Sequence, residues 1–218
     1  MTRYDIPLGC ACCGVSRRQF LVGCAACAGA VAATASPSRL FAADPAKPKI
    51  RIVYALHAPK QPGPDWPNKG FDFNPPMEQI RTELSKRCPG FEFLTSLATG
   101  PEQAKKILAD DKSAGIDGYL VYQMNCWNQV VQTFAASGKP VLYADFQYGG
   151  SGGFLVYNAS FLRAKAANVG FVASSRVEDL AEAVKCFELV KKGGSTAEFV
   201  AATARVRGER TPKAGDAS

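Results

Sequence analysis

Short apolar segments alternate with longer segments of mixed polarity over most of the chain. Runs rich in β-branched and aromatic residues predict strands at residues 50–56, 91–97, 119–123, 141–144 and 169–173. Between the strands, apolar residues recur at the spacing of an amphipathic helix. The predicted helices cover residues 76–86, 101–108, 127–136, 154–167 and 177–191. Proline and glycine fill the loop at residues 57–75.

Strands that are separated by helices of about 10–15 residues are typical of βαβ units, in which the strands are parallel. Right-handed crossovers then place helices on both faces of the sheet. We therefore predict a three-layer α/β sandwich with a doubly wound, mostly parallel sheet of five strands, of the Rossmann or flavodoxin type. The domain is predicted to cover residues 44–194, and the polar segment 195–218 is predicted to be a disordered tail.

The first 43 residues have the pattern of an export signal. Two arginines precede an uncharged stretch, residues 19–38, which contains a small-residue cleavage site of the A-x-A type. The segment S-R-R-Q-F-L at residues 16–21 resembles the twin-arginine (Tat) export signal. The residues that carry this resemblance are Ser16, Arg17, Arg18, Phe20 and Leu21.

This resemblance implies that the Tat translocase is a partner during export and that residues 1–43 are a signal peptide. The protein is then expected to cross the inner membrane and to be periplasmic. An alternative is an uncleaved signal that anchors the protein in the membrane.

Cysteine usage depends on the same cleavage. Five of the eight cysteines lie within residues 1–43, so the mature chain keeps Cys88, Cys126 and Cys186. An odd number argues against a full disulfide framework and allows at most one bridge, whose pairing the spacing does not determine.

Charge and histidine content exclude several classes of function. Removing residues 1–43 leaves 22 basic and 18 acidic residues, and no basic stripe interleaved with aromatic residues is present. A nucleic-acid partner is therefore not expected. His57 is the single histidine, which excludes a metal site built from several histidines. The sequence assigns no catalytic residue and no metal ligand.

Polar and aromatic residues follow the strands at one edge of the predicted sheet. Ligands of open parallel sheets bind beyond the carboxyl ends of the strands. Amides and carboxylates hydrogen-bond to hydroxyl groups, and flat rings stack on the C–H faces of sugars, so this edge suits a neutral sugar or polyol. The candidate binding residues are Gln123, Asn125, Trp127, Asp145, Gly149, Gly150, Ser151 and Gly152.

These residues also have structural interpretations. Asp145 could cap the next turn, Asn125 could cap the following helix, and Trp127 could be a core residue. The glycine cluster at residues 149–153 could be a flexible connection, and it is neither a Walker loop nor a G-x-G-x-x-G motif after the first strand. Three carboxylates at the opposite edge are expected to be solvated: Asp110, Asp111 and Asp117.

Three segments follow one another in an order that is known from another family. They are D-G-Y-L-V-Y-Q-M-N-C-W at residues 117–127, G-K-P-V-L-Y-A-D at residues 138–145 and Y-G-G-S-G-G-F at residues 148–154. Together they resemble the first domain of L-fucose/L-arabinose isomerase-like sugar isomerases, where a strand, a helix, a G-K-P turn, another strand and a glycine-rich loop follow in this order. The similarity covers residues 48–192.

The resemblance implies aldose–ketose isomerisation, in which a divalent metal polarises the sugar oxygens and carboxylates act as acid and base. The metal-binding residues of this family belong to later domains. A cofactor such as Mn²⁺ is therefore expected only if further domains exist. The expected function is that of an exported, sugar-facing relative of the sugar isomerases without their metal-binding catalytic domain. The alternative is a non-catalytic periplasmic domain that binds a ligand or a protein partner.

Overall fold

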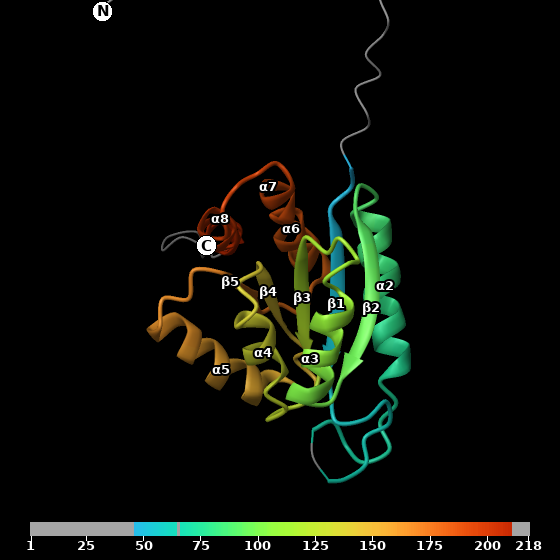
Figure 1. Ribbon diagram of the computed structural model, residues 1–218. Helices are drawn as coiled ribbons and strands as arrows, with labels where there is room; N and C mark the ends of the chain where they lie inside the picture. The colour runs from blue at the N-terminus through green and yellow to red at the C-terminus, as the bar shows by residue number, and fades with distance from the viewer. Residues whose placement is uncertain (1–45, 65, 211–218) are drawn as a thin grey trace, which may run out of the picture. The chain divides into compact units, whose positions relative to one another are not determined.

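Five parallel strands form the centre of the fold, and the computed structural model describes residues 46–64 and 66–210. The strands are β1 (Lys49–Ala55), β2 (Glu92–Ala98), β3 (Gly118–Gln123), β4 (Val141–Asp145) and β5 (Val169–Val172). They lie in the order β2-β1-β3-β4-β5, and each neighbouring pair is parallel (Figure 1). The predicted α/β class with a doubly wound, parallel sheet of five strands is confirmed.

Helices cover both faces of this sheet. They are α2 (Asn74–Arg87), α3 (Pro101–Asp110), α4 (Val130–Ala135), α5 (Ser151–Arg163), α6 (Val177–Lys185), α7 (Phe187–Lys191) and α8 (Thr196–Arg210). Buried side chains of α2, α6, α7 and α8 pack on one face of the sheet. Those of α3, α4 and α5 pack on the other face, which makes the three predicted layers.

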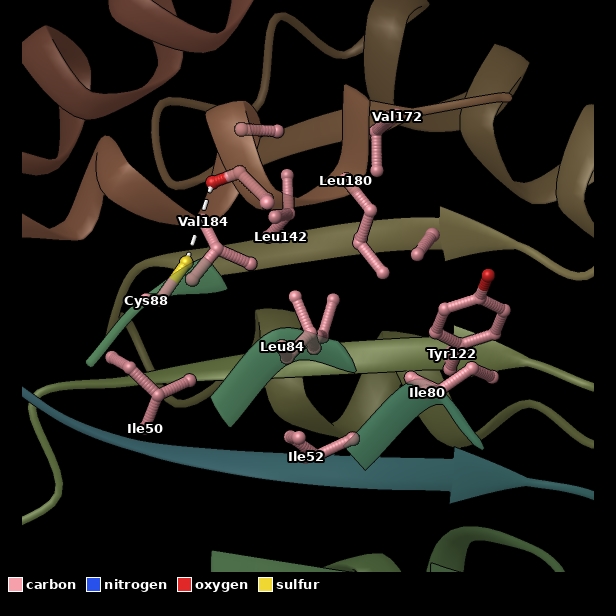
Figure 2. Close-up of a cluster of buried hydrophobic side chains, with 14 of the residues drawn as sticks. Ile50, Ile52, Ile80, Leu84, Cys88, Tyr122, Leu142, Val172, Leu180 and Val184 are labelled. Carbon is pink, nitrogen blue, oxygen red and sulfur yellow. Dashed lines mark hydrogen bonds between the residues drawn. The ribbon is translucent and has the colours of Figure 1, made fainter. Parts of the chain in front are cut away.

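The strands are apolar along their length because both of their faces are covered. In β3, Leu120 and Tyr122 belong to the core under α2 and α6, whereas Tyr119 and Val121 belong to the core under α3 to α5. This alternation follows the two-residue period of a strand. Figure 2 shows the first of these cores, where α2 and α6 meet the sheet.

The segment after residue 195 differs from the prediction. Residues 196–210 form helix α8, which packs against β5, so the prediction of a disordered tail over this range is wrong. Phe199 is fully buried and stacks on Phe187 with ring centroids 4.6 Å apart. Arg207 lies 3.6 Å from the centroid of the Phe171 ring and donates a hydrogen bond to the Phe171 carbonyl. The prediction failed because residues 196–210 contain many polar residues, and only a few apolar residues form the face of α8 that packs on the domain.

The bounds of the predicted helices also differ from the observed ones, and three of these differences affect the interpretation. Helix α5 begins at Ser151, so part of the glycine cluster lies in its first turn. Helix α4 begins at Val130, because Trp127 and Gln129 have positive φ angles of 63° and 55° that are incompatible with a helix. The last predicted helix is divided into α6 and α7 at Cys186.

The carboxylates at the amino edge of the sheet are not all solvated. Asp111 is buried and pairs with Arg51 of β1, whose Nε donates to the carboxylate at 3.0 Å. Asp117 is half-buried, accepts a hydrogen bond from the Lys49 backbone N–H at 2.8 Å and pairs with Lys191 at 2.9 Å. The prediction of a solvated group is therefore wrong for both residues.

The three cysteines of the described residues form no disulfide. Cys88, Cys126 and Cys186 are free thiols, and burial raises the pKa of Cys88 to about 11. Figure 2 shows the Cys88 thiol directed at the Ala181 carbonyl of α6.

Within residues 46–64 and 66–210, no helix is both long enough and apolar enough to cross a bilayer. The predicted export signal lies outside the described residues.

Candidate functional site

The strand order of the sheet reverses between β1 and β3, and Asn125 lies just after the end of β3 at this point. The Asn125 side chain is buried, and its Oδ1 accepts a hydrogen bond from the His57 backbone N–H at 3.1 Å. Its Nδ2 donates to Gln61 Oε1 at 3.2 Å and to the Trp66 carbonyl at 2.9 Å. Because both ends of the amide are bonded within the protein, Asn125 connects the loop after β1 to the end of β3.

Gln123 is also committed to internal hydrogen bonds. It is fully buried at the end of β3, where its Oε1 accepts a hydrogen bond from the Tyr143 hydroxyl at 2.7 Å. Its Nε2 donates to the carbonyl of Asn125. The geometry therefore gives the two predicted amides a role in holding the edge of the sheet together.

The glycines after β4 allow a close approach of two backbone segments. A Cβ atom at Gly150 would lie 1.7 Å from the Gln123 carbonyl oxygen, and one at Gly149 would lie 2.6 Å from Pro67 Cδ. A side chain at either position would force the chain away from the end of β3. These glycines act through packing, and the alternative of a merely flexible connection does not describe them.

Trp127 lies on the outside of this edge. Its side chain is 59% exposed, and its ring meets that of Tyr157 edge-on with centroids 6.2 Å apart. The interpretation of Trp127 as a core residue is therefore wrong. The amide that accepts a hydrogen bond from Val130 at the start of α4 belongs to Asn128, so the interpretation of Asn125 as the helix cap is wrong as well.

Asp145 at the end of β4 is the one buried carboxylate of the carboxyl edge within the described residues. Only 6% of the residue is exposed, and its two carboxylate oxygens accept hydrogen bonds from Ser151 Oγ at 3.0 and 3.1 Å. No lysine or arginine of the described residues forms an ion pair with it. Burial raises the pKa of Asp145, and the bond to Ser151 partly opposes this effect.

Asp145 lines a pocket of about 450 Å³ between α2, the ends of β3 and β4, and the segment that follows β5. We call it the Asp145 pocket. Its aromatic walls are formed by Phe71, Tyr122, Phe146 and Tyr148. Its polar side chains besides Asp145 are Gln79, Glu83, Gln147, Ser174, Ser175 and Arg176. The pocket therefore combines aromatic ring faces with groups that donate hydrogen bonds and groups that accept them.

Three of the predicted residues lie at a second pocket of about 420 Å³. Gly149, Ser151 and Gly152 line it together with Trp66 and Cys126. The Cys126 thiol is held in place by the Gly153 backbone N–H, which donates to Sγ at 3.2 Å. The structure thus distributes seven of the eight predicted residues over two pockets, an internal hydrogen-bond network and an exposed ring, and the eighth, Gly150, packs against the end of β3.

Sequence analysis missed much of the Asp145 pocket. Ser174 and Ser175 come one residue after the end of β5, so the rule that identified Asp145 also points to them. Tyr122 lies within a strand, and Gln79 and Glu83 lie on α2, where no local signal distinguishes a pocket residue from a surface residue. These three residues depend on how α2 packs across the sheet.

The described residues do not form a metal centre. Within residues 46–64 and 66–210, no three His, Cys, Asp or Glu side chains gather so that they could hold a metal ion. His57 is exposed and takes part in the network through its backbone. We therefore assign no step to a divalent metal.

Comparisons with known proteins show distant similarity. No family model and no curated protein matches the chain. Among solved structures it is similar to the transcription regulator CcpA of Lactococcus lactis, with 10% identity over 76% of this chain and 75% of that chain and a TM-score of 0.32. A regulatory protein of the LacI family from Chloroflexus aggregans gives 12% identity, 73% of each chain and a TM-score of 0.32. These values carry no argument about function, and the resemblance to sugar isomerases stays a prediction.

Proposed function

We propose that this protein is exported by the Tat pathway and binds a small sugar or polyol in the Asp145 pocket. The proposal keeps the sugar-facing role that the resemblance to sugar isomerases implies, and it assigns no isomerase turnover to this chain. The observation that carries the binding site is the buried Asp145 carboxylate, which has hydrogen bonds from Ser151 and no cationic partner within the described residues.

A buried carboxylate is costly when its lone pairs are incompletely satisfied. Hydroxyl groups of a ligand donate hydrogen bonds to such a carboxylate without adding charge. Burial raises the pKa of Asp145, and functional sites frequently contain a pocket-lining acid with a shifted pKa. Asp145 is thus suited to anchor a polyhydroxylated molecule.

The aromatic walls of the pocket suit the apolar C–H faces of such a ligand. Tyr122 and Phe146 lie edge to face with centroids 6.3 Å apart, and the Phe146 and Tyr148 centroids are 5.4 Å apart. Together they offer ring surface for the C–H faces of a sugar, while Ser175 offers a hydroxyl group. The volume of about 450 Å³ lies within the usual range of ligand pockets, which is roughly 300–1,000 Å³.

Isothermal titration calorimetry tests the proposal. The purified chain is titrated with a panel of pentoses, 6-deoxyhexoses and polyols at millimolar concentrations, and we expect binding heat for at least one of them. Asp145→Asn is expected to weaken that binding by about tenfold or more, because a charged hydrogen-bond acceptor is lost. Asp110→Asn, at an exposed acid on the opposite edge, is the matched control and should bind as the wild type does.

A flat titration with every compound of the panel would refute sugar or polyol binding. Equal affinity of the wild type and Asp145→Asn would show that the ligand binds elsewhere.

A further inference from the structure

Most of the exposed large apolar side chains of the described residues gather on one surface. Six of these eight side chains are 51–72% exposed and lie on or beside helix α5. We call them the α5 surface: Trp66, Trp127, Tyr148, Leu155, Val156 and Leu162. The other two, Leu97 and Leu189, lie on β2 and α7.

Shared contacts connect the parts of this surface. Trp66, Tyr148 and Gly152 line the same pocket, and Gly152 belongs to the first turn of α5. The ring of Trp127 contacts the ring of Tyr157, which also belongs to α5. The aromatic residues of the loops therefore continue directly into the apolar face of the helix.

The outer face of α5 has the pattern of a helix that packs against another helix. Residues 152, 155, 156, 159 and 162 recur at helical spacing on the side away from the sheet. The opposite side is occupied, because Phe154 and Phe161 pack on the sheet. No charged side chain occurs from Gly152 to Leu162, and the first one after them is Arg163.

We propose that the α5 surface is the interface of a homodimer in which two copies of α5 cross antiparallel about a two-fold axis near Tyr157. In that arrangement Leu155 faces Ala159 of the second copy, and Gly152 faces Leu162. In these two pairs a large side chain meets a small one, as close helix packing requires. The two Arg163 side chains are placed at opposite ends, separated by a helix length of about 18 Å.

The size of the surface favours a second copy of this chain. Six large side chains that are more than half exposed present on the order of 700 Å² of apolar surface, close to the ~800 Å² that each partner contributes to a stable interface. Solvent-exposed apolar patches of monomers are usually smaller than this, roughly 300–600 Å². A C2 interface needs one self-complementary patch, and the sequence of α5 supplies it.

A lipid surface is less well supported. Helices that lie in a membrane interface expose a polar face with several lysine or arginine residues next to the apolar face. The second face of α5 is buried against the sheet, and only Arg163 and Lys165 border the apolar residues at its end. We therefore treat membrane binding as one outcome of the test.

Sedimentation equilibrium of the full chain tests the proposal at about 1–100 µM. The wild type is expected to reach twice the 23.2 kDa mass of one chain. Leu155→Glu places a charge against the partner helix and is expected to weaken dimerisation by about a hundredfold, as for a central interface residue. Leu97→Glu and Leu189→Glu make the same change at exposed leucines outside the α5 surface and should leave the mass unchanged.

Leu155 is 65% exposed, so its replacement does not disturb the core, and the far-UV circular dichroism of each variant confirms its folding. A monomeric wild type at the highest concentration refutes the dimer. A dimer that Leu155→Glu leaves intact, or that the controls weaken equally, refutes this interface. Co-sedimentation of a monomeric wild type with anionic phosphatidylglycerol vesicles, lost in Leu155→Glu, assigns the surface to lipid instead.

Discussion

Two buried aspartates show how residues of one type take different roles. Asp111 is buried beside Arg51, and its side-chain hydrogen bond raises the pKa of that guanidinium, so the two charges satisfy each other. Asp145 is buried at a pocket with only the Ser151 hydroxyl bonded to it. A charge without a partner costs stability, and such a cost is tolerated where the group has a function.

This difference predicts a pH dependence of stability. Because burial raises the pKa of Asp145, the folded protein holds that proton more tightly than the unfolded chain does. The stabilisation is fully present below the ordinary aspartate pKa of 3.8 and is lost as the pH rises through the raised value. Asp145→Asn does not titrate, so its melting temperature should exceed that of the wild type by a few degrees at pH 7 and by less at pH 4. Differential scanning calorimetry at both pH values measures the two differences.

The exposed Asp110→Asn variant is the control for this measurement, and its two differences should both be near zero. A gain for Asp145→Asn that is larger at pH 4 than at pH 7 would contradict the assignment of an uncompensated charge.

At the scale of elements, α8 and α5 differ in how many of their faces are apolar. Helix α8 buries Phe199, Ala202 and Thr203, but it also contains three arginines and two glutamates, which is why its composition looked like that of a disordered segment. Helix α5 is apolar on both sides, so packing on the sheet leaves one apolar face exposed.

The docking of α8 predicts a large effect of one substitution. Phe199→Ala removes a fully buried ring from its stack on Phe187 and is expected to lower the free energy of unfolding by about 3–5 kcal/mol. Ala201→Ser changes an exposed residue of the same helix and should cost less than about 1 kcal/mol. Urea unfolding of both variants gives the two values. Equal stability of Phe199→Ala and the wild type would mean that α8 is not docked.

At the scale of the whole molecule, the sheet separates two surfaces. The Asp145 pocket lies on the side of α2 and α6, and the α5 surface lies on the other side. Tyr148 is the residue that belongs to both, because it lines the pocket and is 72% exposed beside α5. Ligand binding and dimerisation can therefore coexist, and Tyr148 is where they would influence each other.

Export as a folded protein is predicted at this scale as well. Replacing Arg17 and Arg18 by lysine keeps the charge and removes the paired guanidinium groups that define the Tat motif. Export of a reporter fused behind residues 1–43 should then fall to background, as measured by its activity in the periplasmic fraction. Arg3→Lys, outside the motif, should not reduce export. Unchanged export of the double variant would refute the Tat assignment.

Local patterns were sufficient for the arrangement of strands and helices. The β-branched runs and the helical spacing of apolar residues lie within single segments, so they identified all five strands and the parallel sheet. They failed where the deciding contact comes from a distant segment. Asp111 is buried because Arg51 lies opposite it, and 196–210 is helical because β5 and α7 offer a surface for Phe199.

In the candidate site, too, local sequence predicted some features, and packing between distant segments decided the others. The rule that ligands bind beyond the carboxyl ends of parallel strands could be applied to the sequence alone, because strand direction follows from the alternation of strands and helices, and it led to Asp145. Which side chains at that edge face a pocket depends on packing between segments far apart in the chain. Asn125 and Gln123 became internal connectors because partners from the loop after β1 and from β4 reached them, whereas no cation reached Asp145.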